Sequence, residues 1–212
     1  MVLAITAALV LAPLSQSQAS TPALDPKAQE VVLRTRSSNT TYTIYWRSYG
    51  ADGGAKTDYA WGATFRQGPL LRYESRDKRV VADCAARTAT RYYESIGRNE
   101  YSSGPKIAKA YCGIDSELGI VSSRYLGQTE SKFGMLDKIT VADRDGTHIY
   151  LVTSGGEIVG VSSNYQGSKY TIIAEPMSFD RSLPAGDLFS RKSLTSSKVS
   201  KAIQSRGSRP AN

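Results

Sequence analysis

The chain of 212 residues has one histidine and two cysteines, so few side chains are available for common catalytic chemistry. Nucleophilic dyads and triads use a histidine base, and the only imidazole, His148, follows an Asp-Gly turn in "THIYLV". We interpret it as a surface histidine on a hairpin strand. No G-x-S-x-G motif occurs, and two cysteines lack the further ligands of a zinc site. The sequence predicts no catalytic residue, no metal and no cofactor, and therefore a protein that is not an enzyme.

Long apolar runs are also scarce. Val2–Leu14 is shorter than the roughly 20 residues that span a bilayer. It lies in nineteen residues without a charged side chain, and the small residues "SQA" precede Ser20. Although no Lys or Arg follows Met1, this pattern is typical of a cleaved signal peptide over residues 1–19. We therefore expect a periplasmic or secreted protein.

Cys84 and Cys112 agree with export. Two cysteines in an oxidising compartment usually pair, and these are too far apart in sequence for a C-x-x-C redox motif. A bridge between them would close a loop of about 29 residues, which stabilises a protein by about 3–4 kcal/mol in the chain-entropy model. We predict a structural disulfide.

Acidic residues are missing from the end of the chain. The net charge is +8, and residues 191–212 hold six Lys and Arg side chains among serines, without one acid. Such a segment buries little apolar surface, so we expect a flexible basic tail over residues 189–212. Its candidate partners are anionic envelope lipids, and a purely solubilising role is the alternative. Nucleic acid is not expected as a partner of an exported protein.

What the chain has in abundance is strand signals. After a lead-in over residues 20–27, we expect one β domain over residues 28–188 with nine to eleven short strands and no long helical periodicity. "AQEVVLRTRSS" and "NTTYTIYWRSY" are predicted strands, and helix is the alternative at Asp25–Arg36 and Lys106–Gly113. Pro176 should end the last strand or place it at an edge.

Glycine-containing turns separate these strands. "LLRYES" and "RVVADC" form a predicted hairpin whose turn is residues 76–78. "DRDG" over residues 143–146 has the start of a calcium loop but lacks its later ligands, and its Asp-Gly pair is typical of a two-residue hairpin turn. Gly155-Gly156 predicts a further turn between two strands.

Aromatic residues are the other feature, with thirteen tyrosines, two tryptophans and four phenylalanines mostly on predicted strands. If the sheet curls, one face becomes a concave lining that could hold an acyl chain; ordinary core packing is the alternative.

Three segments, read in order, resemble the LolA-like superfamily of periplasmic outer-membrane lipoprotein carriers and related lipid-binding and envelope proteins. They are "GPLLRYES" with "RVVADC", "TATRYYESIGRNEY", and "DGTHIYLVTSGGEIVGVSSNYQGSKYTIIAE" with "LPAGDLF". The resemblance implies a mainly β fold, a curved antiparallel sheet (half-barrel) with one or two short helices. A closed β-sandwich is the alternative fold.

The resemblance also implies a site. Arg72 matches the strand arginine that ties the lid of the carriers to their sheet, and Trp46, Trp61, Phe65 and Tyr73 become candidate lining residues. The chain departs from the carriers in its basic character and in lacking evident amphipathic lid helices.

The function expected is non-catalytic binding of a hydrophobic or lipidated ligand in the concave face. The alternatives are an envelope or surface interaction protein with a filled β core and a basic tail, and a histidine-independent enzyme on the same fold.

Overall fold

The computed structural model describes residues 24–95, 98–115 and 119–208. The predicted signal peptide over residues 1–19 lies outside the described residues, as does the first half of the lead-in, residues 20–23. No helix in the described ranges is long and apolar enough to cross a membrane.

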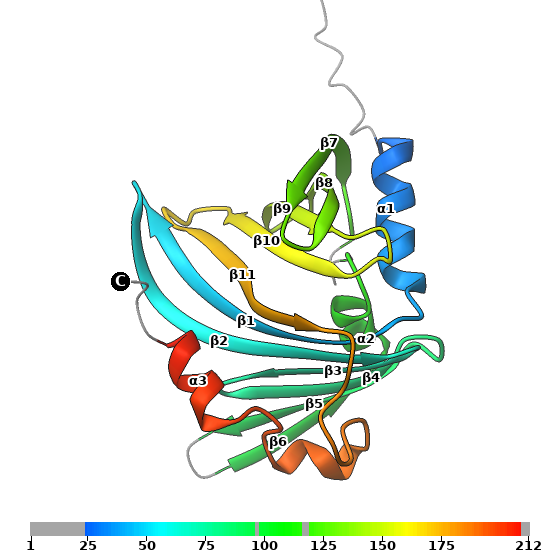
Figure 1. The fold of residues 1–212 in the computed structure, drawn as a ribbon, viewed down its shortest axis with the longest axis vertical. Helices are drawn as coiled ribbons and strands as arrows, with labels where there is room; N and C mark the ends of the chain where they lie inside the picture. The colour runs from blue at the N-terminus through cyan, green and yellow to red at the C-terminus, as the bar shows by residue number, and fades with distance from the viewer. Residues whose placement is uncertain (1–23, 96–97, 116–118, 209–212) are drawn as a thin grey trace, which may run out of the picture.

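Eleven antiparallel strands form one strongly curved sheet (Figure 1). They are β1 (Thr41–Asp52), β2 (Ala55–Gln67), β3 (Leu70–Ser75), β4 (Lys78–Asp83), β5 (Thr88–Ser95), β6 (Arg98–Ser103), β7 (Ser122–Ser131), β8 (Gly134–Ala142), β9 (Gly146–Val152), β10 (Ile158–Tyr165) and β11 (Thr171–Asp180). The order β6-β5-β4-β3-β2-β1-β11-β10-β9-β8-β7 joins two meanders through the β1–β11 pair. The half-barrel prediction is confirmed, and the closed sandwich is not the fold.

Helix α1 (Pro26–Ser37) occupies a segment that the sequence analysis assigned to a strand. Asp25 caps it by accepting hydrogen bonds from the amides of Lys27 and Ala28, and Pro26 stands at its first position. Its buried residues recur at helical spacing: Ala28, Val31, Val32 and Thr35. The first three pack with Ile139 and Val141 of β8. The strand prediction is wrong here, and the helix alternative at Asp25–Arg36 is right.

Helix α2 (Pro105–Tyr111) confirms the second helix alternative. Ile107 and Ala108 cover β4 and β5, and the predicted disulfide joins Cys84, just after β4, to Cys112 at the helix end, with a Cα–Cα distance of 5.3 Å. The bridge therefore fastens α2 to the sheet.

The predicted turns are present. Residues 76–77 separate β3 from β4, and Asp143 Oδ1 accepts hydrogen bonds from the amides of Asp145 and Gly146 between β8 and β9. Pro176 lies inside β11, but β10 pairs only with Thr171–Ala174, so Pro176 has a partner strand on one side alone. The predicted edge position is thus correct for the C-terminal half of β11, which contains Pro176.

The two faces of the sheet are both covered over β2–β4. We call the face that carries Trp46, Tyr73 and Val80 the inner face; α1 and α2 pack on it. The outer face carries the alternate residues, among them Phe65 and Arg72, which are cross-strand partners.

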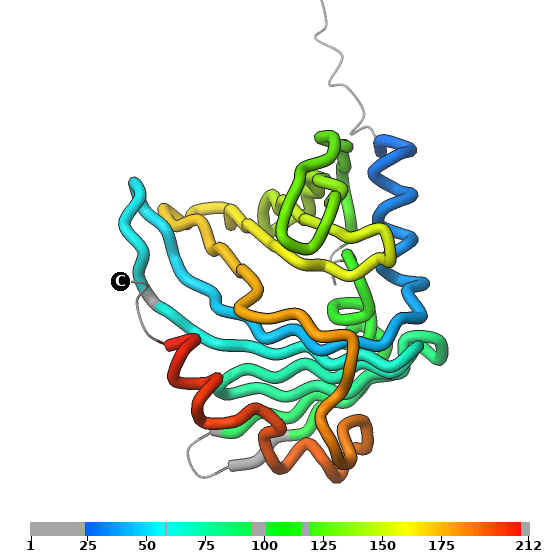
Figure 2. The backbone as a smooth tube through the Cα atoms, in the orientation of Figure 1, coloured from blue at the N-terminus to red at the C-terminus, as the bar shows by residue number. Residues whose placement is uncertain are grey.

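The C-terminal segment, residues 188–208, covers the outer face. It contains a 3₁₀ turn, η1 (Arg191–Thr195), and helix α3 (Lys201–Gly207), and Figure 2 shows the chain descending from β11 across the lower strands before α3 turns back along them. Leu188 and Val199 pack with Phe65, and Leu194 packs with Val81 and Tyr92.

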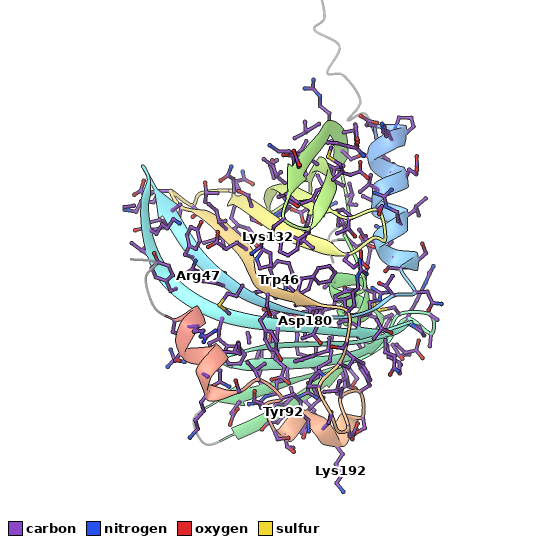
Figure 3. All side chains as sticks on the ribbon, in the orientation of Figure 1. Trp46, Arg47, Tyr92, Lys132, Asp180 and Lys192 are labelled. Atoms are coloured by element: carbon purple, nitrogen blue, oxygen red, sulfur yellow. A yellow bond between two sulfur atoms is a disulfide. The ribbon has the colours of Figure 1, made fainter. Side chains whose placement is uncertain are left out.

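The expectation of a flexible tail is therefore wrong for residues 189–208, because Leu194 and Val199, which lie between its serines, are buried against the sheet. In Figure 3, Tyr92 lies beside this segment while the exposed Lys192 projects from it into solvent.

Candidate functional site

The inner face holds a half-open cavity of about 500 Å³. Its wall comes from β1–β4, from β9–β11 and the loops before β9 and β10, and from the neighbouring ends of α1 and α2. Seven aromatic residues line it: Tyr42, Trp46, Trp61, Tyr73, Tyr111, Tyr150 and Tyr165. Polar residues line it as well, among them Thr35, Arg66, Asp115, Asp143, His148 and Ser163. The hollow expected from the aromatic strands exists, but its wall mixes aromatic with charged and hydrogen-bonding groups.

Three of the predicted lining residues, Trp46, Trp61 and Tyr73, lie in this wall. Trp46 donates a hydrogen bond from Nε1 to Thr64 Oγ1 at 3.0 Å, which fixes its indole on the neighbouring strand. The ring of Tyr73 lies 5.3 Å from that of Tyr111, so β3 and α2 contribute adjacent aromatic rings. Burial raises the pKa of the Tyr73 hydroxyl, which therefore stays protonated.

Phe65 and Arg72 lie elsewhere. Phe65 is fully buried on the outer face beneath Leu188 and Val199. Trp61 belongs to the same outer cluster through its side chain, although the residue also borders the cavity. Phe65 and Arg72 are thus not lining residues.

Arg72 does tie a covering segment to the sheet, but on the side opposite the cavity. Its guanidinium donates to the carbonyls of Leu188, Ser193 and Ser196 in the C-terminal segment. The resemblance placed such a tie at the lid over the concave face. The structure shows the arginine holding the outer face instead.

His148 is a cavity residue that the sequence analysis treated as a surface histidine. It is 7% exposed. Its Nδ1 lies 2.9 Å from Ser163 Oγ, and its Nε2 lies 3.5 Å from Asp143 Oδ1. The ring packs edge-on against Tyr165. The sequence did indicate this position through the spacing of His148 and Tyr150 in "THIYLV". Residues two apart on a strand share a face, so His148 lies on the same face as that aromatic residue.

These side chains have the types of a serine-histidine-aspartate triad, but their backbone context does not resemble one. Ser163 and His148 are direct cross-strand partners in β10 and β9. Ser163 also pairs with Ile172 in β11, so the backbone here belongs to ladders on both sides. Acyl transfer needs free hydrogen-bond donors aimed at an oxyanion. The backbone around Ser163 pairs with β9 and β11 instead. The cluster is suited to binding a polar group.

The outer face has a second hollow, of about 800 Å³, over β8–β11. Apolar side chains such as Ile149, Leu151 and Ile173 line it together with Arg47 and Glu175, which form an ion pair of 2.8 Å. Within the described ranges no group of three or more His, Cys, Asp or Glu side chains is placed to hold a metal ion.

No family model matches the sequence, and no curated protein matches it. Among solved structures, an uncharacterized conserved protein from Thermus thermophilus is similar, with a TM-score of 0.51, 13% identity, and coverage of 84% of this chain and 97% of that chain. A structure of PNGF-II has a TM-score of 0.50 at 9% identity, and the match covers 70% of this chain but only 29% of PNGF-II.

The LolA superfamily protein NE2245 from Nitrosomonas europaea is also found, with a TM-score of 0.40, 8% identity, and coverage of 78% of this chain and 98% of that one. At these identities a likeness concerns the fold alone.

Proposed function

We propose that the protein is an exported, non-catalytic binding protein that holds a hydrophobic or lipidated ligand in the cavity of the inner face. The observation that carries the proposal is the cavity of about 500 Å³ with aromatic side chains from β1, β3, β9, β10 and α2 in its wall. Burying an acyl chain there would contribute about 0.8 kcal/mol per CH₂ group. Polar groups in the same wall favour a ligand with a polar head over a plain hydrocarbon.

The disulfide supports an oxidising location. Cys84 and Cys112 are joined, and such bridges persist mainly outside the cytosol. The apolar start of the sequence agrees with export. We therefore propose a periplasmic or extracellular location.

The proposal is tested by extracting the purified protein with organic solvent and analysing the extract for lipids by mass spectrometry. Uptake of a fluorescent fatty acid is measured in parallel. Ser48→Phe, which fills the cavity from β1, should abolish uptake. Ser162→Phe adds the same ring to the outer face of β10 and should bind as the wild type does. A lipid-free wild type without fatty-acid uptake would contradict the proposal.

A second candidate function rests on the exposed cations of the C-terminal segment. Arg191, Lys192, Lys201 and Arg206 are all exposed, and such groups attract anionic lipid surfaces. Deleting the segment would also remove Leu194 and Val199 from the core, so charge reversal is the better test. Lys192→Glu with Lys201→Glu should weaken sedimentation with phosphatidylglycerol vesicles. Equal sedimentation of wild type and variant would remove this candidate.

A further inference from the structure

Arg66 is a buried cation in the wall of the cavity. It lies near the end of β2 on the inner face, opposite Tyr42 of β1, and it is 2% exposed. Its Nε donates to the carbonyl of Gly68 at 2.9 Å, and its Nη1 reaches the carbonyl of Thr35 at 3.5 Å. These direct partners are neutral, so neither supplies a full negative charge to the guanidinium.

Other buried arginines of the sheet are neutralised. Arg72 pairs with Glu74, and Arg79 pairs with Glu94, each at 2.5 Å. Over the described ranges no carboxylate oxygen lies within 4.0 Å of a nitrogen of Arg66. Glu157, whose charge reaches Tyr42, is bound instead by Thr153 and Arg181. Arg66 is thus the exception among them.

A buried charge without a counter-charge is costly. Thr35 lies in the last turn of α1, and the helix dipole there offsets part of the positive charge. A ligand anion entering the cavity would offset the rest, because charge-assisted hydrogen bonds from a guanidinium are among the strongest in proteins.

Tyr42 adds a second donor at the same place. It is 5% exposed, faces Arg66 across the β1–β2 pair and lines the cavity. Burial raises the pKa of its hydroxyl, while the charge of Arg66 opposes that rise. The hydroxyl remains protonated at neutral pH and can donate to an anion.

We infer that Arg66 and Tyr42 bind the carboxylate of a long-chain fatty acid whose acyl chain lies along the aromatic wall. The inference rests on the proposed function and names its ligand class. One guanidinium matches the single charge of a carboxylate, and the aromatic residues Trp46 and Tyr73 lie farther along the same cavity wall.

The test compares two probes, a dansyl-labelled undecanoic acid and its methyl ester, in fluorescence titrations at neutral pH. The wild type should bind the acid about tenfold or more tightly than the ester, because hydrogen bonds to charged groups are the stronger ones. Arg66→Met should reduce this ratio to near one through loss of acid affinity, with the ester affinity kept. Tyr42→Phe should reduce it in part.

Arg124→Met removes the same charge from an exposed position on β7 and should leave the ratio unchanged. The comparison of acid and ester binding by the wild type does not depend on whether any variant folds. If the wild type binds acid and ester equally, or if Arg66→Met keeps the full preference, the head-group inference is overturned while the binding function stands. If neither probe binds, the proposed function fails first.

Discussion

Arg72 and Glu74 stand two residues apart on β3, are both fully buried, and are joined between Nε and Oε1 at 2.5 Å. Each also bonds to the C-terminal segment. Arg72 Nη2 donates to the Ser196 carbonyl at 2.9 Å, and Glu74 Oε1 accepts from the Lys198 amide at 2.9 Å. The pair therefore connects the outer face of the sheet to a segment more than a hundred positions later in the chain.

Replacing Glu74 should release that segment. Glu74→Ala leaves the Arg72 guanidinium buried without its carboxylate, and breaking a buried pair in this way typically costs about 3–5 kcal/mol. We expect this loss in the free energy of unfolding measured with urea, together with faster amide exchange over residues 196–208. Glu130→Ala, at an exposed position on β7, is the control. Unchanged exchange over residues 196–208 would contradict the role of the pair.

The two tryptophans should report ligand binding differently. Trp46 lines the cavity, whereas the side chain of Trp61 packs beneath α3. A fatty acid that enters the cavity should change the emission of Trp46 only. The Trp61→Phe protein should therefore keep the ligand-induced change, and the Trp46→Phe protein should lose it. A change that persists in Trp46→Phe would place the ligand elsewhere.

Reduction of the Cys84–Cys112 bridge should destabilise the fold. The bridge closes a loop with a sequence separation of 28, and loops of this size correspond to about 3–4 kcal/mol in the chain-entropy model. Urea unfolding with and without dithiothreitol measures the effect. A Cys84→Ala, Cys112→Ala double variant should match the reduced wild type and should not respond to the reductant. An equal midpoint for the oxidised and reduced wild type would show that α2 needs no covalent tie.

Acid should remove the contribution of Glu157. Burial raises its pKa, but hydrogen bonds from Thr153 and Arg181 outweigh burial and hold the pKa below the ordinary value of 4.5. A depressed folded-state pKa means that the stabilisation is complete above pH 4.5 and is lost as the pH falls through the folded value.

The stability difference between the wild type and Glu157→Gln should accordingly shrink as the pH falls from about 6 to about 3 in urea titrations. A difference that stays constant over this range would show that the folded state does not hold Glu157 preferentially ionised.

Local patterns predicted most of the sheet. Alternation in "LLRYES" and the Asp145-Gly146 turn were enough to place hairpins, because both depend on neighbouring residues. Helix α1 was missed because Val31 and Val32 are β-branched and were interpreted as strand residues. The helical spacing of its apolar residues and the capping residue Asp25 both indicated a helix. The prediction followed the β-branched residue types instead.

The cavity was predicted less well than the fold. Phe65 and Arg72 were assigned to the lining, yet they lie on the outer face. Sequence alternation separates two faces but does not say which one is concave, and β4 is buried on both. The sequence did not indicate that Arg66 is buried in the cavity wall. Its burial depends on contacts with α1 and Tyr42, which form only when the sheet folds.

The pairing of β1 with β11 divides the assembly of the fold into early and late events. β1–β6 and β7–β11 are each built from successive hairpins, whereas the seam matches Thr43 with Asp180 and Ala51 with Thr171. Contacts between such remote parts of a chain form slowly. The middle of the sheet therefore stays unpaired until β11 docks on β1, and until then the exposed edge of β1 is open to aggregation.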